Sequence, residues 1–253
     1  MSTILVPYHH DDLLPAETFP LSVPDPVVVT PTLPTGDIWR RLSSLYGTVA
    51  DTVAAGVTAD GAVTVLSGDC LVALATLAGV QRAGHDPSLV WFDAHGDVHT
   101  LQTTTSGYLG GLSLRLALGA HPELLADPLG LSPVDERRTV LSDARDLDPP
   151  EAEFLAGSGI RQVAVADVGP DLLPEGPLVV HVDVDVVDAS ELPGLLFPTT
   201  GGPSAGTVLA ACRRLLDSGR VVAMDVACTW RPGATGPDQR TRADFVTALT
   251  VPA

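Results

Sequence analysis

The chain has 253 residues, 45% of them hydrophobic, and a formal net charge of −17. Because such an acidic surface repels phosphate backbones and anionic lipid headgroups, we expect neither nucleic acid nor a membrane as partner. All 14 basic residues are arginines, which excludes mechanisms that need a lysine amine, such as a phosphate-loop lysine or a Schiff base.

We expect a single domain over residues 1–253, because this length suits one α/β core and no low-complexity linker interrupts it. No apolar run approaches the roughly 20 residues of a membrane span, and the N-terminus lacks a signal-peptide pattern, so we expect a cytoplasmic protein. The three cysteines, at positions 70, 212 and 228, are odd in number and widely spaced, which favours reduced thiols over a disulfide framework.

Short apolar runs alternate with helical patterns along the chain. This alternation predicts right-handed βαβ units and a mostly parallel sheet with helices over both faces. The expected strands are 3–6, 63–66, 89–92, 139–141, 162–165, 178–182 and 221–226. The expected helices are 37–55, 71–83, 111–118, 149–156 and 204–218, with Asp37 and Ser204 as N-caps. Long loops are expected at 11–35, 98–110 and 189–203, and loops of such length are more often functional than idle.

The first polar cluster, Asp93-Ala-His95-Gly-Asp97, directly follows the strand predicted at 89–92. Positions 93, 95 and 97 alternate by two, so in extended backbone their side chains would share one face. Carboxylates and an imidazole on one face suit a hard or borderline divalent ion such as Mn²⁺. The alternative is an Asp-rich turn in which His95 is exposed or bonded to the backbone.

The second cluster, His181-Val-Asp183-Val-Asp185, closes the strand predicted at 178–182. His181 either faces the same side as Asp183 or is a strand histidine bonded to the backbone. Carboxyl ends of parallel strands line one crevice, so the two clusters can converge, and their acids would repel one another without cations. A strand followed by Asp-x-Asp also resembles the phosphatases of the haloacid-dehalogenase type, with Asp183 as nucleophile. That alternative leaves the Asp93 cluster unexplained and needs an arginine near the phosphate.

Five segments follow one another in a recognisable order along the chain. They are Ser67-Gly-Asp69-Cys70, Trp91-Phe-Asp93-Ala-His95-Gly-Asp97, Thr103-Thr-Thr-Ser106-Gly107, Ala144-Arg145-Asp146-Leu-Asp148 and Asp183-Val-Asp185. With these segments the chain resembles the arginase/agmatinase family of ureohydrolases from about residue 63 to 232. The resemblance implies a three-layer αβα sandwich around a central parallel sheet, a dinuclear Mn²⁺ centre, a small-molecule substrate and a homo-oligomer.

The resemblance also implies roles for individual residues. Asp93 and Asp183 would bridge two metal ions, and Asp97 would help to hold one ion and the attacking nucleophile. Cys70 stands where the family has a histidine ligand, and this exchange of nitrogen for sulfur lowers Mn²⁺ affinity and favours Zn²⁺ or an empty position. The metal-facing positions implied are Cys70, Asp93, His95, Asp97, Asp183 and Asp185.

Further departures from the family pattern lie on the substrate side. Gly110 replaces the histidine that shuttles protons, and His99 replaces an asparagine. Ser106 and Asp148 match positions that hold the substrate. Cys228 replaces the carboxylate that pairs with a guanidinium, and burying that cation without a counter-charge costs several kcal/mol.

These observations lead to a metal-dependent hydrolase of a non-peptide C–N bond in a linear amidine or guanidino compound. In the family mechanism, activated water attacks the amidine carbon and a nearby acid protonates the leaving amine. We assign catalysis and substrate binding to Asp97, Ser106 and Asp148. We expect weak or no activity on L-arginine and a less basic substrate such as an N-hydroxyguanidine. The alternative is a degenerate member that binds one metal or none and acts as a scaffold or binding protein.

Overall fold

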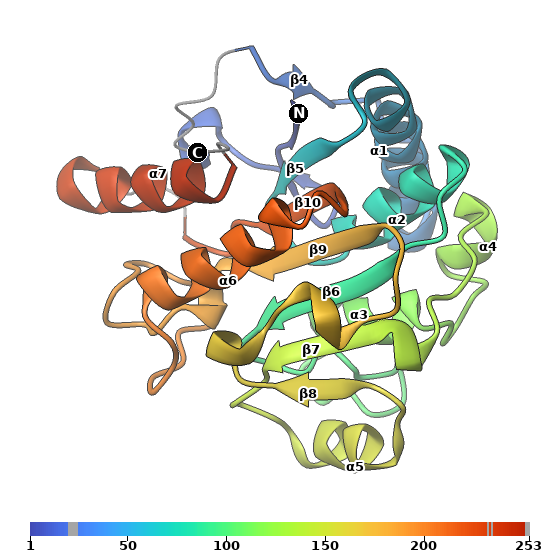
Figure 1. The fold of residues 1–253 in the computed structure, drawn as a ribbon. Coiled ribbons are helices and arrows are strands. Elements are labelled where there is room, and N and C mark those ends of the chain that lie inside the picture. The colour runs from blue at the N-terminus through green and yellow to red at the C-terminus, as the bar shows by residue number, and fades with distance from the viewer. Residues whose placement is uncertain (20–24, 232, 234, 251–253) are drawn as a thin grey trace.

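The fold is built on one eight-stranded sheet in which every pairing is parallel (Figure 1). The computed structural model describes residues 1–19, 25–231, 233 and 235–250. The strand order is β4-β1-β5-β10-β9-β6-β7-β8. The strands are β1 Ser2–Val6, β4 Val27–Val28, β5 Val63–Ser67, β6 Ser88–Asp93, β7 Thr139–Asp143, β8 Arg161–Val163, β9 Leu178–Asp183 and β10 Val221–Ala227. A separate antiparallel pair joins β2 Tyr8–His9 to β3 Asp12–Leu13.

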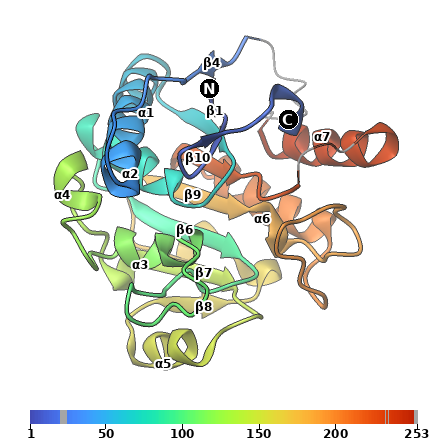
Figure 2. The ribbon, with the colours of Figure 1, turned by 180° about the vertical axis from the view of Figure 1, so that it is seen from behind.

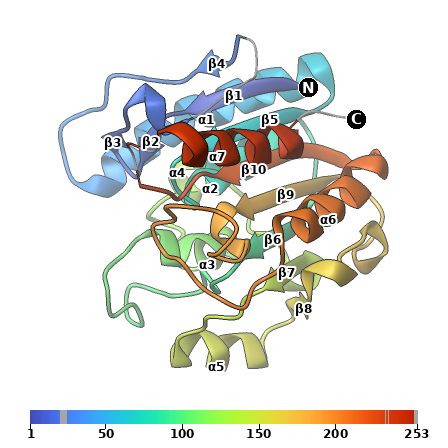
Figure 3. The ribbon, with the colours of Figure 1, turned by 90° about the vertical axis from the view of Figure 1, so that its left-hand side faces the viewer.

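Helices cover both faces of the sheet, which confirms the predicted three-layer αβα sandwich (Figure 2). One face carries α1 Ile38–Asp60, α2 Val72–Arg82, α3 Ser113–Ala117 and α4 Ala126–Leu129. The other face carries α6 Ala205–Asp217 and α7 Gly236–Thr250, which lie side by side (Figure 3), and α5 Pro149–Gly157 lies at the β8 edge. Short 3-10 turns are η1 Ala16–Thr18, η2 Gly110–Leu112, η3 Glu136–Arg138, η4 Val165–Asp167, η5 Pro170–Leu172 and η6 Val184–Val186.

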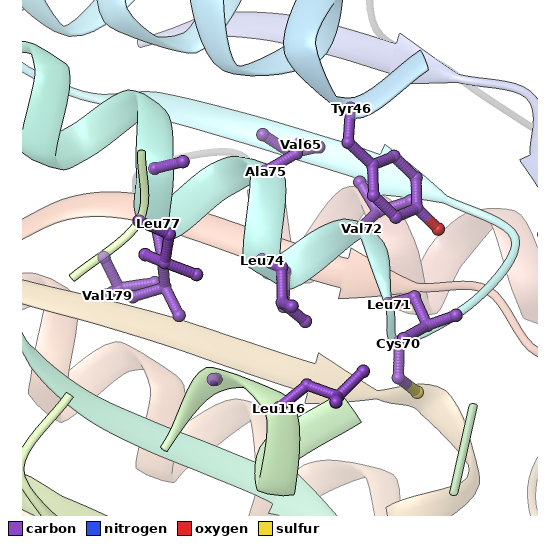
Figure 4. Packing of buried hydrophobic residues seen from close by; sticks show 14 of the residues in the cluster. Tyr46, Val65, Cys70, Leu71, Val72, Leu74, Ala75, Leu77, Leu116 and Val179 are labelled. Carbon is purple, nitrogen blue, oxygen red and sulfur yellow. The ribbon is translucent and has the colours of Figure 1, made fainter. Parts of the chain in front are cut away.

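The two apolar layers follow from the two-residue period of the strands. On β6, Leu89 and Trp91 belong to the cluster under α1 and α2, whereas Val90 and Phe92 belong to the cluster under α6 and α7. Figure 4 shows the first cluster, with Leu77 of α2 beside Val179 of β9. Because both faces of these strands are covered, the sequence reads as continuous apolar runs rather than as alternation.

Several elements differ from the sequence predictions. The first helix continues to Asp60 and ends at Gly61, whose φ of 76° terminates it. The helix predicted at 111–118 is the 3-10 turn η2 followed by the five residues of α3. Strands β2, β3 and β4 were missed because each has only two residues, and two of them fall within the loop predicted at 11–35.

The helix α7 was also missed, because its sequence is mainly polar and opens with Gly-Pro. Its apolar contacts with the sheet come from only three buried side chains, Phe245, Val246 and Leu249. Among the described residues, none of the helices is both long enough and apolar enough to cross a bilayer.

The sheet brings together the strand ends that carry the polar clusters. Strands β5, β10, β9 and β6 are neighbours, and Asp93 and Asp183 are the last residues of β6 and β9. Because all four strands run in the same direction, the residues after them meet at one edge of the sheet.

The packing of α1 against α2 generates a matched pair of stability predictions. A Cβ atom on Gly79 of α2 would lie 2.6 Å from the Ala50 carbonyl oxygen and 2.6 Å from Val53 Cβ. We expect Gly79→Ala to lower the free energy of unfolding by about 1–3 kcal/mol through overpacking, despite the better helix propensity of alanine. At Gly47 of α1 a Cβ atom would meet nothing within 4 Å among the described residues, so Gly47→Ala should raise this energy by about 0.5–1 kcal/mol. Urea unfolding of both variants measures the difference, and equal effects would contradict this account of the helix contact.

Candidate metal centre

Two buried carboxylates form the base of the site. Asp93 is 1% exposed and Asp183 is 3% exposed. Each Oδ1 accepts a hydrogen bond from the backbone N–H two residues later, that of His95 at 2.8 Å and that of Asp185 at 2.8 Å. These turns, rather than the extended backbone expected from the alternation, fold the following side chains back over the carboxylates. The predicted convergence is therefore confirmed, but the extended geometry is wrong.

His95 joins the two clusters. Its Nδ1 lies 3.3 Å from Asp93 Oδ1 and 3.3 Å from Asp185 Oδ2. Burial alone would lower the pKa of His95, but hydrogen bonds to Asp185 and Asp93 raise it to about 12. Each of these three residues offers one atom that could bind a metal ion, and the three atoms lie within 4.8 Å of one another. His95 follows an Asp-rich turn, but its side chain is half-buried and contacts carboxylates rather than the backbone.

Cys70 reaches the same point from the end of β5. Its Sγ donates a hydrogen bond to Asp183 Oδ2 at 2.9 Å, while Thr229 Oγ1 donates to Asp183 Oδ1 at 2.5 Å. Figure 4 shows Cys70 at the edge of the apolar cluster, with its sulfur near the arrowhead of β9. Burial, and then the charge of Asp183, raise the pKa of the Cys70 thiol well above its ordinary value.

Asp97 has an unused oxygen in this cluster. Its backbone is left-handed, with φ of 53°, and Asp97 Oδ2 has no hydrogen-bond partner among the described residues although it is buried. Burial, and then the charges of Asp93 and Asp183, raise the pKa of Asp97 well above its ordinary value. A buried carboxylate oxygen without a donor is costly, and a cation removes that cost.

The donor set fits divalent metal ions. Burial and the charge of Asp93 raise the pKa of Asp183 to about 6, and burial and the charge of Asp183 raise that of Asp185 well above its ordinary value. Carboxylates this close together ionise fully only beside positive charge. Carboxylate oxygens and one imidazole suit Mn²⁺, and a neighbouring thiol adds a preference for Zn²⁺.

A pocket of about 280 Å³ opens above these residues. Asp93 does not line the pocket. Its carboxylate contacts His95, which does, and Trp91 Nε1 donates to Asp93 Oδ2 at 3.1 Å. The other positions selected from the sequence line the pocket: Cys70, His95, Asp97, Ser106, Asp148, Asp183 and Asp185.

Sequence reasoning missed two residues of the pocket wall. Glu151 lies three residues after Asp148, and the two form a capping box at the start of α5, a pattern that the sequence does display. Phe197 lies in the loop at 189–203, whose length was noted, but nothing in the sequence distinguishes this side chain from its neighbours. None of the described residues that line the pocket is a lysine or an arginine, so the geometry does not favour the phosphatase alternative.

Asp148 and Ser106 lie on the rim of the pocket. His99 Nε2 is 3.1 Å from Asp148 Oδ2 and 3.8 Å from Glu151 Oε2. The imidazole therefore contacts Asp148, the carboxylate to which the resemblance assigns substrate binding. Ser106 Oγ accepts a hydrogen bond from the Tyr108 N–H at 3.1 Å.

Tyr108 fills the space beside Gly110. A Cβ atom on Gly110 would lie 2.4 Å from Tyr108 Cε1, so this ring and a side chain at position 110 exclude one another. The Tyr108 hydroxyl is buried and has no hydrogen-bond partner within the described part of the chain. Burial raises the pKa of Tyr108 well above its ordinary value, so the phenol stays protonated and can donate.

Cys228 follows β10 directly and is 2% exposed within the apolar cluster of α6 and α7. Burial raises the pKa of its thiol, so this position carries no negative charge near neutral pH. It does not line the pocket.

Comparison with known proteins places these residues in context. Residues 21–241 match the family described as the Arginase family. The arginase of Eremothecium gossypii is 32% identical over 196 residues, which make up 70% of this chain and 49% of that protein. The N(omega)-hydroxy-L-arginine amidinohydrolase of Streptomyces lavendulae is 32% identical over 149 residues, which make up 57% of this chain and 53% of that protein. The chain thus spans about half the length of the curated relatives it matches.

Solved structures share the fold over nearly the whole chain. The arginase from Bacillus cereus superimposes with a TM-score of 0.83, covering 98% of this chain and 96% of that chain at 23% identity. The arginase from Entamoeba histolytica, crystallised with L-ornithine, gives a TM-score of 0.83 at 19% identity.

The raised pKa values generate a prediction for the metal-free protein. A buried carboxyl that binds its proton more tightly when folded stabilises the fold most while protonated. The contribution of Asp183 to the free energy of unfolding should therefore fall as the pH rises from its ordinary pKa of 3.8 to about 6. Because metal ions bind the ionised carboxylates, added Mn²⁺ or Zn²⁺ should raise the Tm strongly at pH 7.5 and little at pH 5. Thermal unfolding at both pH values measures this rise in Tm. In Asp183→Asn, added metal should no longer raise the Tm. An equal rise at pH 5 and pH 7.5 in the parent protein would contradict the prediction.

Proposed function

The chain belongs to the arginase family, and from this premise we propose that it is a metal-dependent hydrolase of a linear amidine or guanidino compound. The proposal rests on one observation. Two acidic clusters from distant parts of the sequence meet in one pocket, where His95 lies 3.3 Å from both Asp93 and Asp185. The single domain stays a prediction from the chain length, and the homo-oligomer stays a prediction of the resemblance.

The cofactor of this proposal is one or two divalent ions, Mn²⁺ or Zn²⁺. When bound, they would supply Lewis acidity and make water nucleophilic near neutral pH. The residues that would hold them are Cys70, Asp93, His95, Asp97, Asp183 and Asp185.

Three residues of this chain would act on the water, the leaving amine and the ammonium end of the substrate. Asp97 lines the pocket, and its buried Oδ2 has no donor among the described residues. This oxygen would orient the attacking water and accept its proton. The Tyr108 hydroxyl is buried beside Gly110, where the family's proton shuttle is missing, and has no partner among the described residues. It would hydrogen-bond the leaving amine and give it a proton. Asp148 would bind the ammonium end of an amino-acid substrate, with His99 as competitor for that carboxylate.

The substrate we favour is less basic than L-arginine. The resemblance places at position 228 the carboxylate that pairs with a guanidinium. Cys228 is neutral and does not line the pocket, so a charged guanidinium would lack that counter-charge. An N-hydroxyguanidine needs less compensation because it is a weaker base. The similarity to a hydroxyarginine amidinohydrolase supports this choice, although arginases are equally similar to the chain.

A substrate screen tests the proposed activity. The protein loaded with Mn²⁺ or Zn²⁺ is assayed for urea or hydroxyurea release from L-arginine, agmatine, Nω-hydroxy-L-arginine and guanidino acids. We expect kcat/KM for the hydroxyguanidine to exceed that for L-arginine by at least about tenfold, a difference of ~1.4 kcal/mol. Asp93→Asn serves as the inactive control. A preference for L-arginine would overturn the argument from Cys228, and no turnover by metal-loaded protein would favour the scaffold alternative.

The role of Tyr108 is tested by removing its hydroxyl alone. We expect Tyr108→Phe to lower kcat by about 10² or more with KM little changed, because proton donation acts in the transition state. Tyr8→Phe, which removes a hydroxyl from a residue that does not line the pocket, is the matched control. An unchanged kcat in Tyr108→Phe would show that another group protonates the leaving amine.

A further inference from the structure

His181 is a buried imidazole that the proposed mechanism does not use. It lies on β9 two residues before Asp183 and is 0% exposed. Its Nδ1 is 2.8 Å from Asp225 Oδ1 on β10, and its ring stacks on Trp91 with 3.7 Å between centroids. Its Nε2 has no hydrogen-bond partner among the residues that the structure describes. Of the two alternatives left by the sequence, the backbone-bonded one is therefore wrong.

The partners of His181 fix its orientation and tautomer. Thr76 Oγ1 donates to Asp225 Oδ2 at 2.6 Å, so both oxygens of this fully buried carboxylate are engaged. Asp225 can only accept, so Nδ1 carries the proton and Nε2 keeps its lone pair. A carboxylate that holds one imidazole nitrogen in this way is the usual support of a metal-binding histidine.

The free nitrogen has suitable neighbours. Atoms of Cys70, Asp93 and His181 that can bind a metal lie within 4.8 Å of one another, and all three residues are buried. Because Nδ1 is bonded to Asp225, Nε2 is the nitrogen available to a ligand. Sulfur, imidazole nitrogen and carboxylate oxygen together form a donor set typical of Zn²⁺ rather than of Mn²⁺.

We propose that His181 is a metal ligand and that, with Cys70 and Asp93, it forms a zinc-type site. The inference rests on the proposed function, because Asp93 also belongs to the centre proposed there. The imidazole that position 70 does not provide would come instead from strand β9, which lies two strands from β5. On binding, the Cys70 thiol loses its proton to solvent and its hydrogen bond to Asp183, and the thiolate binds the ion.

A thiol nucleophile activated by His181 would use the same residues differently. In the structure, however, Cys70 Sγ donates to Asp183 Oδ2 rather than to His181 Nε2, and Cys70 is only 3% exposed. The contacts therefore favour the metal site.

Cobalt and zinc binding to the full chain tests this inference without any activity assay. Metal-free protein is titrated with Co²⁺, and we expect an intense near-ultraviolet thiolate-to-cobalt band that Zn²⁺ abolishes by displacement. Cys70→Ser should remove the band, and His181→Gln should lower Zn²⁺ affinity by at least about tenfold. Asp225→Asn, which leaves every ligand in place, should lower it by about 10–100-fold. Cys212→Ser and His121→Gln, which remove a buried thiol and a histidine outside the cluster, are the matched controls and should bind like the parent.

X-ray absorption at the zinc edge of the unmodified protein makes the test independent of whether the variants fold. One sulfur and at least one imidazole in the zinc shell would support the site. Binding of Co²⁺ and Zn²⁺ without sulfur, together with unchanged affinity in His181→Gln, would overturn the inference and leave the proposed hydrolase standing. Failure to bind Mn²⁺, Co²⁺ or Zn²⁺ at all would overturn both.

Discussion

The whole site depends on carboxylates that are forced together inside the protein. Asp93 and Asp183 end neighbouring strands, and both are buried almost completely. Burial, and then the negative charge of Asp93, raise the pKa of Asp183 to about 6, because a second carboxylate charge is harder to form away from water. The apolar layers on both faces of the sheet hold this arrangement in place. A cation bound at this sheet edge would offset the repulsion among these carboxylates.

Two of the departures from the family pattern, at positions 70 and 110, lie beside buried polar groups. His95 and Asp185 keep the family residues and lie 3.3 Å apart. Cys70, by contrast, sits near His181, and Gly110 lies against the Tyr108 ring. At both positions the family's histidine is absent, and a buried polar atom without a partner among the described residues lies nearby. These atoms are His181 Nε2 and the Tyr108 hydroxyl oxygen. In the roles proposed for them, His181 and Tyr108 would supply a metal ligand and a proton donor, and this favours altered chemistry over a degenerate scaffold.

Much of the fold and the meeting of the acidic residues at one sheet edge could be predicted from sequence, because each rests on local patterns. Apolar runs such as 89–92 and 178–182 mark the central strands, and the acids that follow them mark the edge where strands end. Strand β4 could not be predicted, since its two residues form a strand only by pairing with β1. His181 could be placed on a strand but not assigned, because its partner Asp225 comes from β10, 44 residues away. Tertiary contacts of this kind leave no trace in local sequence.

The central claim is that the acids of both clusters share divalent cations, and anomalous diffraction from crystals soaked in Mn²⁺ or Zn²⁺ tests it most directly. The account predicts one or two anomalous peaks bounded by Asp93 and Asp183, with His95 and Asp185 around one of them. Crystals that contain no metal at this edge of the sheet, or that bind it only among surface carboxylates, would contradict it.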